Sequence, residues 1–145
     1  MADLDWVSSM SVGIAEFDAA HKGYITALKG IAAALAAGRA DEAERLCASF
    51  LALAQDHGRR ELAFLRRKRF PQIEMVAETQ AATQARIENL LTAIRRDPAE
   101  AFGMIDAMRA AVVSYLLHGD INFKSFVQEL ADRGESIDPS ETGEV

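Results

Sequence analysis

The sequence predicts an all-α protein, folded as an antiparallel up-down-up-down four-helix bundle with an extended N-terminal arm. Apolar residues recur at helical spacing through four long segments, and the breaks between these segments are short. Alanine is abundant, only 7% of the residues are aromatic and the chain has three prolines, so helix is favoured over strand. Short connections place successive helices side by side, which is typical of an up-down bundle.

The 145 residues are enough for one domain with a full core. We expect an arm over residues 1–14, a bundle over 15–132 and a mobile tail over 133–145. The arm is too apolar to float free, because it carries Trp6, Val7, Met10, Val12 and Ile14. The tail is polar and contains two glycines and a proline, so we expect it to be mobile.

The first helix is predicted from about Asp18, as N-cap, to Ala37, with Gly38 as its terminator. The second should begin after Asp41, with Glu44 completing a capping box. Its apolar face extends along the helix and contains two polar residues, His57 and Glu61. The residues on this face are Leu46, Phe50, Leu53, Ala54, His57, Glu61 and Phe64.

Phe70-Pro71 separates the second helix from the third, whose apolar face runs from Ile73 to Ile94. The fourth helix has the clearest start signal, with Asp97 as N-cap and Pro98 at the first helical position. We expect it to continue through Tyr115 and Phe126 to about Leu130 as one helix.

Composition excludes several classes of function. The net charge of −6 argues against a general nucleic-acid binder, and the single Cys47 excludes an intramolecular disulfide. The acidic N-terminus lacks a basic leader, and no apolar run is long enough to span a membrane. We therefore expect a cytoplasmic protein without a nucleic-acid or membrane partner, and Cys47 as a small buried residue.

The three histidines of the chain, His21, His57 and His118, fall on three different predicted helices. His57 and Glu61 are four residues apart, so their side chains share one helix face and can reach one ion. In a bundle all four side chains can converge. Without an ion, the same spacing fits a buried His–Glu hydrogen bond or a surface position, and the residues alone leave these alternatives open.

Six motifs make the chain resemble the hemerythrin family, in particular the bacterial hemerythrins, over about residues 6 to 127. They are Trp6, Ser11-Val12-Gly13-Ile14, Phe17-Asp18-x-x-His21-Lys22, His57-x-x-x-Glu61, Phe70-Pro71 and His118. The N-terminal run is the most specific of them. The resemblance implies a four-helix bundle that holds a non-haem di-iron centre and binds oxygen reversibly.

By this resemblance, His21 and His57 match the histidines of the iron that receives oxygen. Glu61 matches a bridging carboxylate, and His118 matches one histidine of the second iron. The family's other ligands are absent, since Val76 and Gln80 stand where it has histidines and Phe123 where it has an aspartate. The resemblance therefore implies a depleted site.

We expect such a site to hold one non-haem iron, through His21, His57 and Glu61 with His118 as a further ligand. Two histidines and a carboxylate suit Fe(II) and are tolerable for Zn(II). The polar Gln80 and Asn122 are expected to face inward, where they bind a ligated water or satisfy the carboxylate. A core hydrogen-bond network without metal explains both residues equally well.

The predicted function is binding or sensing of a small diatomic ligand, O2 or NO, instead of di-iron oxygen carriage. The alternative is a metal-free regulatory or protein-interaction module of the same lineage. An enzyme with mononuclear iron is less well supported, because no dedicated acid, base or substrate pocket stands out, and we expect no catalysis.

A run of basic residues interrupts the otherwise acidic chain after the His57 motif. It consists of Arg59, Arg60, Arg66, Arg67, Lys68 and Arg69. The simplest interpretation is a solvated outer face of the second helix and its loop. The sharper one is a docking patch for an acidic protein partner.

Overall fold

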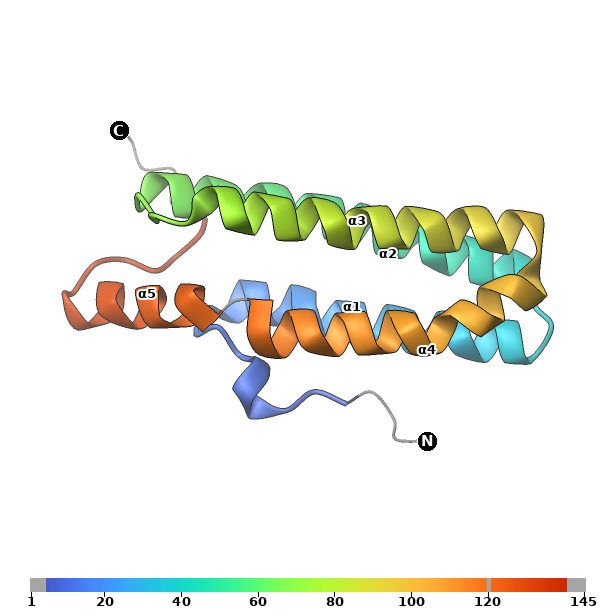
Figure 1. The fold of residues 1–145 in the computed structure, drawn as a ribbon. Helices are drawn as coiled ribbons and strands as arrows, with labels where there is room; N and C mark the ends of the chain where they lie inside the picture. Colours follow the sequence, from blue (N-terminus) through green and yellow to red (C-terminus); the bar gives the residue numbers. More distant parts are fainter. Residues whose placement is uncertain (1–4, 120, 141–145) are drawn as a thin grey trace.

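The computed structural model describes residues 5–119 and 121–140, and every regular element in these two ranges is helical (Figure 1). The prediction of an all-α chain is confirmed. The elements are η1 Ser8–Met10, α1 Ala15–Ala36, α2 Ala40–Arg67, α3 Ile73–Arg96, α4 Pro98–Ser114, the π-helix η2 Tyr115–Gly119 and α5 Ile121–Asp132.

Four long helices form a bundle, as the sequence predicts. α1 packs against α2 and α4, and α3 packs against the same two helices. Figure 1 shows α2 and α3 along one side and α1 and α4 along the other. Each helix therefore turns one face towards a common interior. None of the helices in the described ranges is both long and apolar enough to cross a membrane.

The first helix begins earlier than predicted. α1 starts at Ala15 with Ile14 as its N-cap, so the prediction of Asp18 as N-cap is wrong. The Asp18 carboxylate instead accepts hydrogen bonds from Ser11 Oγ at 2.5 Å and from the Val12 amide at 2.9 Å. Asp18 thus fastens the preceding segment to the first turn of the helix.

Two of the three predicted signals at helix ends, Gly38 and Asp97, act as expected, and the capping box at the start of α2 does not. Gly38 has a φ of 75°, a left-handed conformation that ends α1 as predicted. Asp97 caps α4 as predicted, accepting from the amides of Ala99 at 3.1 Å and Glu100 at 3.4 Å. The capping box on α2 is wrong, because the helix starts at Ala40 and Glu44 pairs with Arg95 of α3 at 2.7 Å.

The predicted fourth helix is interrupted. α4 ends at Ser114, and the π-helical turn Tyr115–Gly119 lies between it and α5. A π-helical turn holds more residues than an α-helical turn, so it rotates the helix face that follows. The inward residues of α5 include Phe123 and Val127.

The buried apolar residues form two clusters. The larger contains Tyr24, Phe50, Ile87 and Tyr115 and fills the bundle between the long helices. The smaller, which we call the α5 cluster, joins α5 to the segment before α1. Its buried members are Val12, Ile14, Phe17, Phe64, Leu65, Phe70, Val76, Phe123, Val127 and Leu130.

The two ends of the described chain both contact the bundle. Met10, Val12 and Ile14, before α1, are buried at 3%, 1% and 2% exposure. After α5, Ile137 packs against the α5 cluster, and Pro139 O accepts a hydrogen bond from Arg67 Nη2 at 3.1 Å. The predicted tail is therefore placed against the bundle as far as residue 140, and residues 141–145 lie outside the described ranges.

Candidate metal centre

Three of the four predicted ligands meet in the interior of the bundle. His21 comes from α1, and His57 and Glu61 come from α2. One ligand atom from each lies within 4.8 Å of those of the other two. We call these residues the His/His/Glu triad. Their exposed fractions are 0%, 2% and 0%, so bulk water does not reach them.

Helix geometry explains the pairing within α2. His57 and Glu61 are one turn apart, and His57 Nε2 lies 3.6 Å from Glu61 Oε2. This distance exceeds that of a hydrogen bond, so neither atom satisfies the other. Packing of α1 against α2 brings in the third member, His21. The ring centroids of His21 and His57 are 4.7 Å apart.

The triad leaves buried polar atoms unsatisfied. Within the described part of the chain, both ring nitrogens of His21, Nε2 of His57 and Oε2 of Glu61 have no hydrogen-bond partner. An unpaired buried polar group costs about 1–3 kcal/mol, and a charged one more. A cation bound by one ring nitrogen of His21, by His57 Nε2 and by Glu61 Oε2 would satisfy three of these four atoms, so the residues present fit a single metal ion.

Gln80 of α3 satisfies the other carboxylate oxygen. Its Nε2 donates to Glu61 Oε1 at 2.5 Å, and the side chain is 6% exposed. Gly58 makes room for this amide, because a Cβ at that position would lie 2.9 Å from Gln80 Oε1. The prediction that Gln80 faces inward and satisfies the carboxylate agrees with this contact.

Burial shapes the charge state of the triad. Burial, together with the nearby His57, lowers the pKa of His21 from 6.5 to about 4, so His21 is neutral near pH 7. Burial would raise the pKa of Glu61, but His57, His21 and Gln80 outweigh it and hold this pKa below its ordinary value. A neutral imidazole and an ionised carboxylate are the forms that bind metal.

Aromatic rings enclose the triad, and the sequence analysis did not single them out as part of the site. The Phe17 ring lies 5.2 Å from the His57 ring, and the Tyr24 and Tyr115 rings each lie 5.5 Å from the His21 ring. Phe17 belongs to the α5 cluster and both tyrosines to the larger one, so the triad occupies the junction of the two. The available signal was the position of Phe17 and Tyr24 on the inward face of α1.

Two of the positions that the resemblance would give to a second iron, Val76 and Phe123, are apolar. Val76 and Phe123 are 7% and 1% exposed and belong to the α5 cluster. The Phe123 ring lies 6.0 Å from the Phe17 ring and 6.5 Å from the Phe64 ring. Packed hydrocarbon occupies these two positions, so neither of them supplies a ligand for a second ion.

The last two predicted residues have different outcomes. The backbone of His118 lies in the π-helix, and its side chain falls outside what the structure describes, so the prediction for this ligand stays a prediction. Asn122 is exposed, so the prediction that it faces inward is wrong. Its neighbour Phe123 is buried, and successive residues of a helix point about 100° apart, so Asn122 faces away from the interior.

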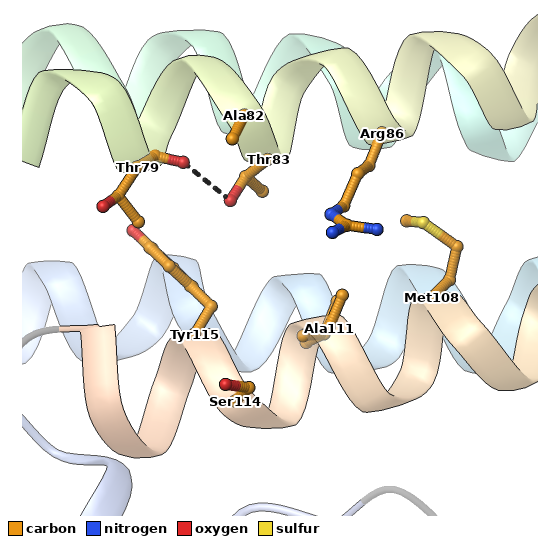
Figure 2. A pocket seen from close by; sticks show the side chains of 9 residues that line it. Thr79, Ala82, Thr83, Arg86, Met108, Ala111, Ser114 and Tyr115 are labelled. Carbon is orange, nitrogen blue, oxygen red and sulfur yellow. Dashed lines mark hydrogen bonds between the residues drawn. The ribbon is translucent and has the colours of Figure 1, made fainter.

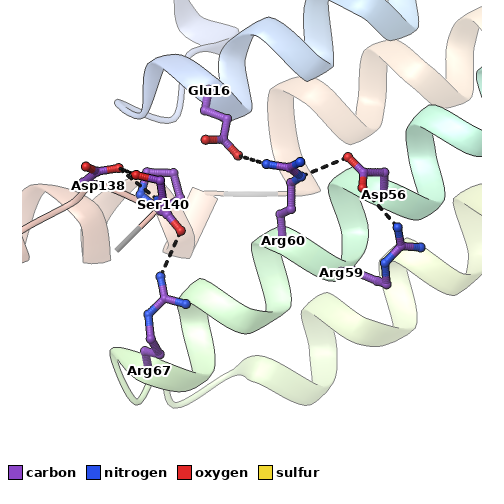
Figure 3. Close-up of polar contacts among 8 residues, drawn as sticks. Glu16, Asp56, Arg59, Arg60, Arg67, Asp138 and Ser140 are labelled. Carbon is purple, nitrogen blue, oxygen red and sulfur yellow. Dashed lines mark hydrogen bonds and ion pairs between the residues drawn. The ribbon is translucent and has the colours of Figure 1, made fainter. Parts of the chain in front are cut away.

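Part of the basic run is neutralised by neighbours within the chain (Figure 3). Arg60 pairs with Asp56 at 2.9 Å and with Glu16 at 3.2 Å, and Arg59 pairs with Asp56 at 3.0 Å. Arg67 donates to the backbone of the C-terminal segment. These contacts agree with a solvated outer face and leave the docking patch as a hypothesis carried by Arg66, Lys68 and Arg69.

Comparison with known proteins gives no relative: no protein-family model, no curated protein and no solved structure matches the chain significantly.

Proposed function

We propose that this chain is a hemerythrin-like metal-binding protein with a depleted site, which holds one non-haem iron and binds or senses a small diatomic ligand. The observation that carries the proposal is the His/His/Glu triad itself, in which each residue has a buried ligand atom without a hydrogen-bond partner. The imidazoles and the carboxylate would hold the ion. When bound, Fe(II) on two histidines and a carboxylate would offer positions for O2 or NO.

The surroundings of the triad favour one ion and a small ligand. Gln80 fixes one oxygen of Glu61 and leaves the other turned towards the histidines. Phe17, Tyr24 and Tyr115 exclude bulk water and limit the size of what can approach. His118 is a further ligand in this proposal, because it matches a ligand histidine in the resemblance and its backbone lies in η2, which follows α4.

The fold assignment also has a finer form that belongs to this proposal. We infer the antiparallel up-down-up-down order, with residues 1–14 as an arm along the bundle. The short connections between α1, α2, α3 and α4 and the contacts of consecutive helices support the order. The burial of Val12 and Ile14 supports the arm.

A metal-free regulatory or interaction module is the alternative. The hydrogen bond from Gln80 to Glu61 favours it, because a carboxylate oxygen that is already satisfied has less need of a cation. In this version the polar residues form a core network, and the basic run binds an acidic partner.

Metal analysis separates the two functions. Full-length protein is loaded anaerobically with Fe(II), desalted and analysed for iron. We expect near-stoichiometric iron in the unaltered protein and its loss in the His57→Ala, Glu61→Ala double variant. NO added to the loaded protein should produce a new electron paramagnetic resonance signal.

The chain offers a matched control on the same helix. Asp56 and Arg60 form an exposed pair with the same four-residue spacing, so the Asp56→Ala, Arg60→Ala variant should keep its iron. Absence of iron from the unaltered protein, with its helical circular dichroism intact, would support the metal-free alternative. A second iron per chain would overturn the single-ion site.

A further inference from the structure

A groove of about 380 Å³ lies between α3 and α4, apart from the interior of the His/His/Glu triad (Figure 2). This volume is within the range of small-molecule sites, which is about 300–1,000 Å³. Arg86 extends from α3 towards Met108, and Tyr115, the first residue of η2, extends towards Thr79 (Figure 2). The two helices thus contribute complementary walls.

The floor of the groove is apolar. Met108, Val112 and Tyr115 line it. They are 4%, 3% and 8% exposed, and all three belong to the larger core cluster, whose other side chains pack against them. The Met108 thioether at one end of this floor and the Tyr115 ring at the other (Figure 2) offer polarisable surfaces suited to a flat hydrocarbon or aromatic ligand.

The hydroxyl groups of Thr79 and Thr83, on the α3 side of the groove, already donate hydrogen bonds to backbone carbonyls. Thr79 Oγ1 donates to Met75 O, and Thr83 Oγ1 donates to Thr79 O, both at 3.0 Å. The hydroxyls can therefore only accept further hydrogen bonds. The charged donor of the groove is Arg86, which is exposed and has neither an ion pair nor a hydrogen bond to another residue that the structure describes.

We propose that this groove binds a small aromatic carboxylate, with its ring on the Met108–Val112–Tyr115 floor and its carboxylate on Arg86. The planar guanidinium donates two parallel hydrogen bonds to a carboxylate, which fixes the orientation of the ligand. No acidic residue is among the described residues that line the groove, so a cationic ligand finds no counterpart there.

Tyr115 places this ligand beside the triad without contact to it. The ring that lines the groove lies 5.5 Å from the His21 ring and stacks on Tyr24 at 6.2 Å. The aromatic layer therefore separates the two sites. Ligand binding in the groove requires no metal, so the proposal is tested independently of the proposed function.

The test is a nuclear magnetic resonance titration of the full-length, metal-free protein at physiological salt. The probes are phenylacetate and its neutral counterpart phenylacetamide. Phenylacetate should produce saturable shifts at the Met108 methyl and at the amides of residues 79–86 and 108–115. Phenylacetamide should bind at least about tenfold more weakly, because it cannot form the charged pair.

Three variants locate the interaction. Arg86→Gln should weaken phenylacetate about tenfold and leave phenylacetamide unchanged. Arg66→Gln, an exposed arginine on α2 with the same change in net charge, should have no effect. Ala111→Phe, which places a ring in the groove, should abolish binding of both probes.

Several results would overturn the proposal. These are the absence of saturable shifts, shifts that map away from the groove, or equal affinity for the acid and the amide. An equal effect of Arg86→Gln and Arg66→Gln would also overturn it, because it would show a general charge effect without a site.

Discussion

Two opposing effects meet in the substitution Gly58→Ala, and their magnitudes predict its sign. Replacing glycine by alanine inside a helix stabilises by about 1 kcal/mol. The new Cβ would lie 2.9 Å from Gln80 Oε1 and 3.1 Å from Gln84 Nε2, so the Gln80 amide must move. Losing its hydrogen bond to the buried Glu61 carboxylate costs about 1.5–3 kcal/mol. The difference is a net destabilisation of about 0.5–2 kcal/mol.

The assay is urea unfolding of metal-free protein, followed by circular dichroism, in a double-mutant cycle with Gln80→Ala. In the Gln80→Ala background the amide is gone, so Gly58→Ala should change sign and stabilise by up to about 1 kcal/mol. Gly103→Ala is the control, because a Cβ there meets nothing within 4 Å. It should stabilise both backgrounds equally.

Equal stabilisation by Gly58→Ala in the unaltered protein and in the Gln80→Ala variant would refute this prediction. That result would show that the Gln80 amide does not lie against Gly58 and does not depend on it for its contact with Glu61.

Three further predictions concern individual side chains. Because the pKa of His21 is lowered from 6.5 to about 4, the unfolded chain binds more protons between these values. The free energy of unfolding of metal-free protein should fall by up to about 3 kcal/mol as pH drops through this window, and urea titrations should show a shallower fall for His21→Gln. Asp97→Ala removes the α4 cap and should cost about 1 kcal/mol in the same assay, with iron content unchanged. Burial raises the pKa of Cys47 to about 12, so a thiol reagent near neutral pH should label it only on unfolding, and rapid labelling of the native protein would contradict its burial.

The predictions that held depend on neighbours in the chain. Gly38 ends α1 and Asp97 caps α4 because a left-handed residue and a short carboxylate act on the backbone beside them. The prediction of Asp18 as N-cap failed because Asp18 bonds to Ser11 and Val12 of the preceding segment. α1 begins three residues before Asp18, at Ala15. The start of this helix therefore depends on how the segment before α1 folds against it.

The predictions about the site also include one that follows from neighbours in the chain and one that was wrong. The pairing of His57 with Glu61 follows from a spacing of one helical turn, and sequence alone indicates it. The prediction that Asn122 faces inward was wrong, because Phe123 takes the buried position beside it and successive residues of a helix point about 100° apart. The sequence alone did not show which of these two neighbours packs into the interior.

The sequence by itself determined that the chain forms four long helices and that one of them carries a histidine and a glutamate on the same inward face. These features depend on backbone hydrogen bonding and on the helical repeat, which act over a few residues. Only the tertiary structure decided that His21 joins the pair, that Gln80 takes one carboxylate oxygen and that Phe123 fills the neighbouring space. Each of these contacts joins different helices, so it depends on how the helices rotate against one another as their apolar faces pack.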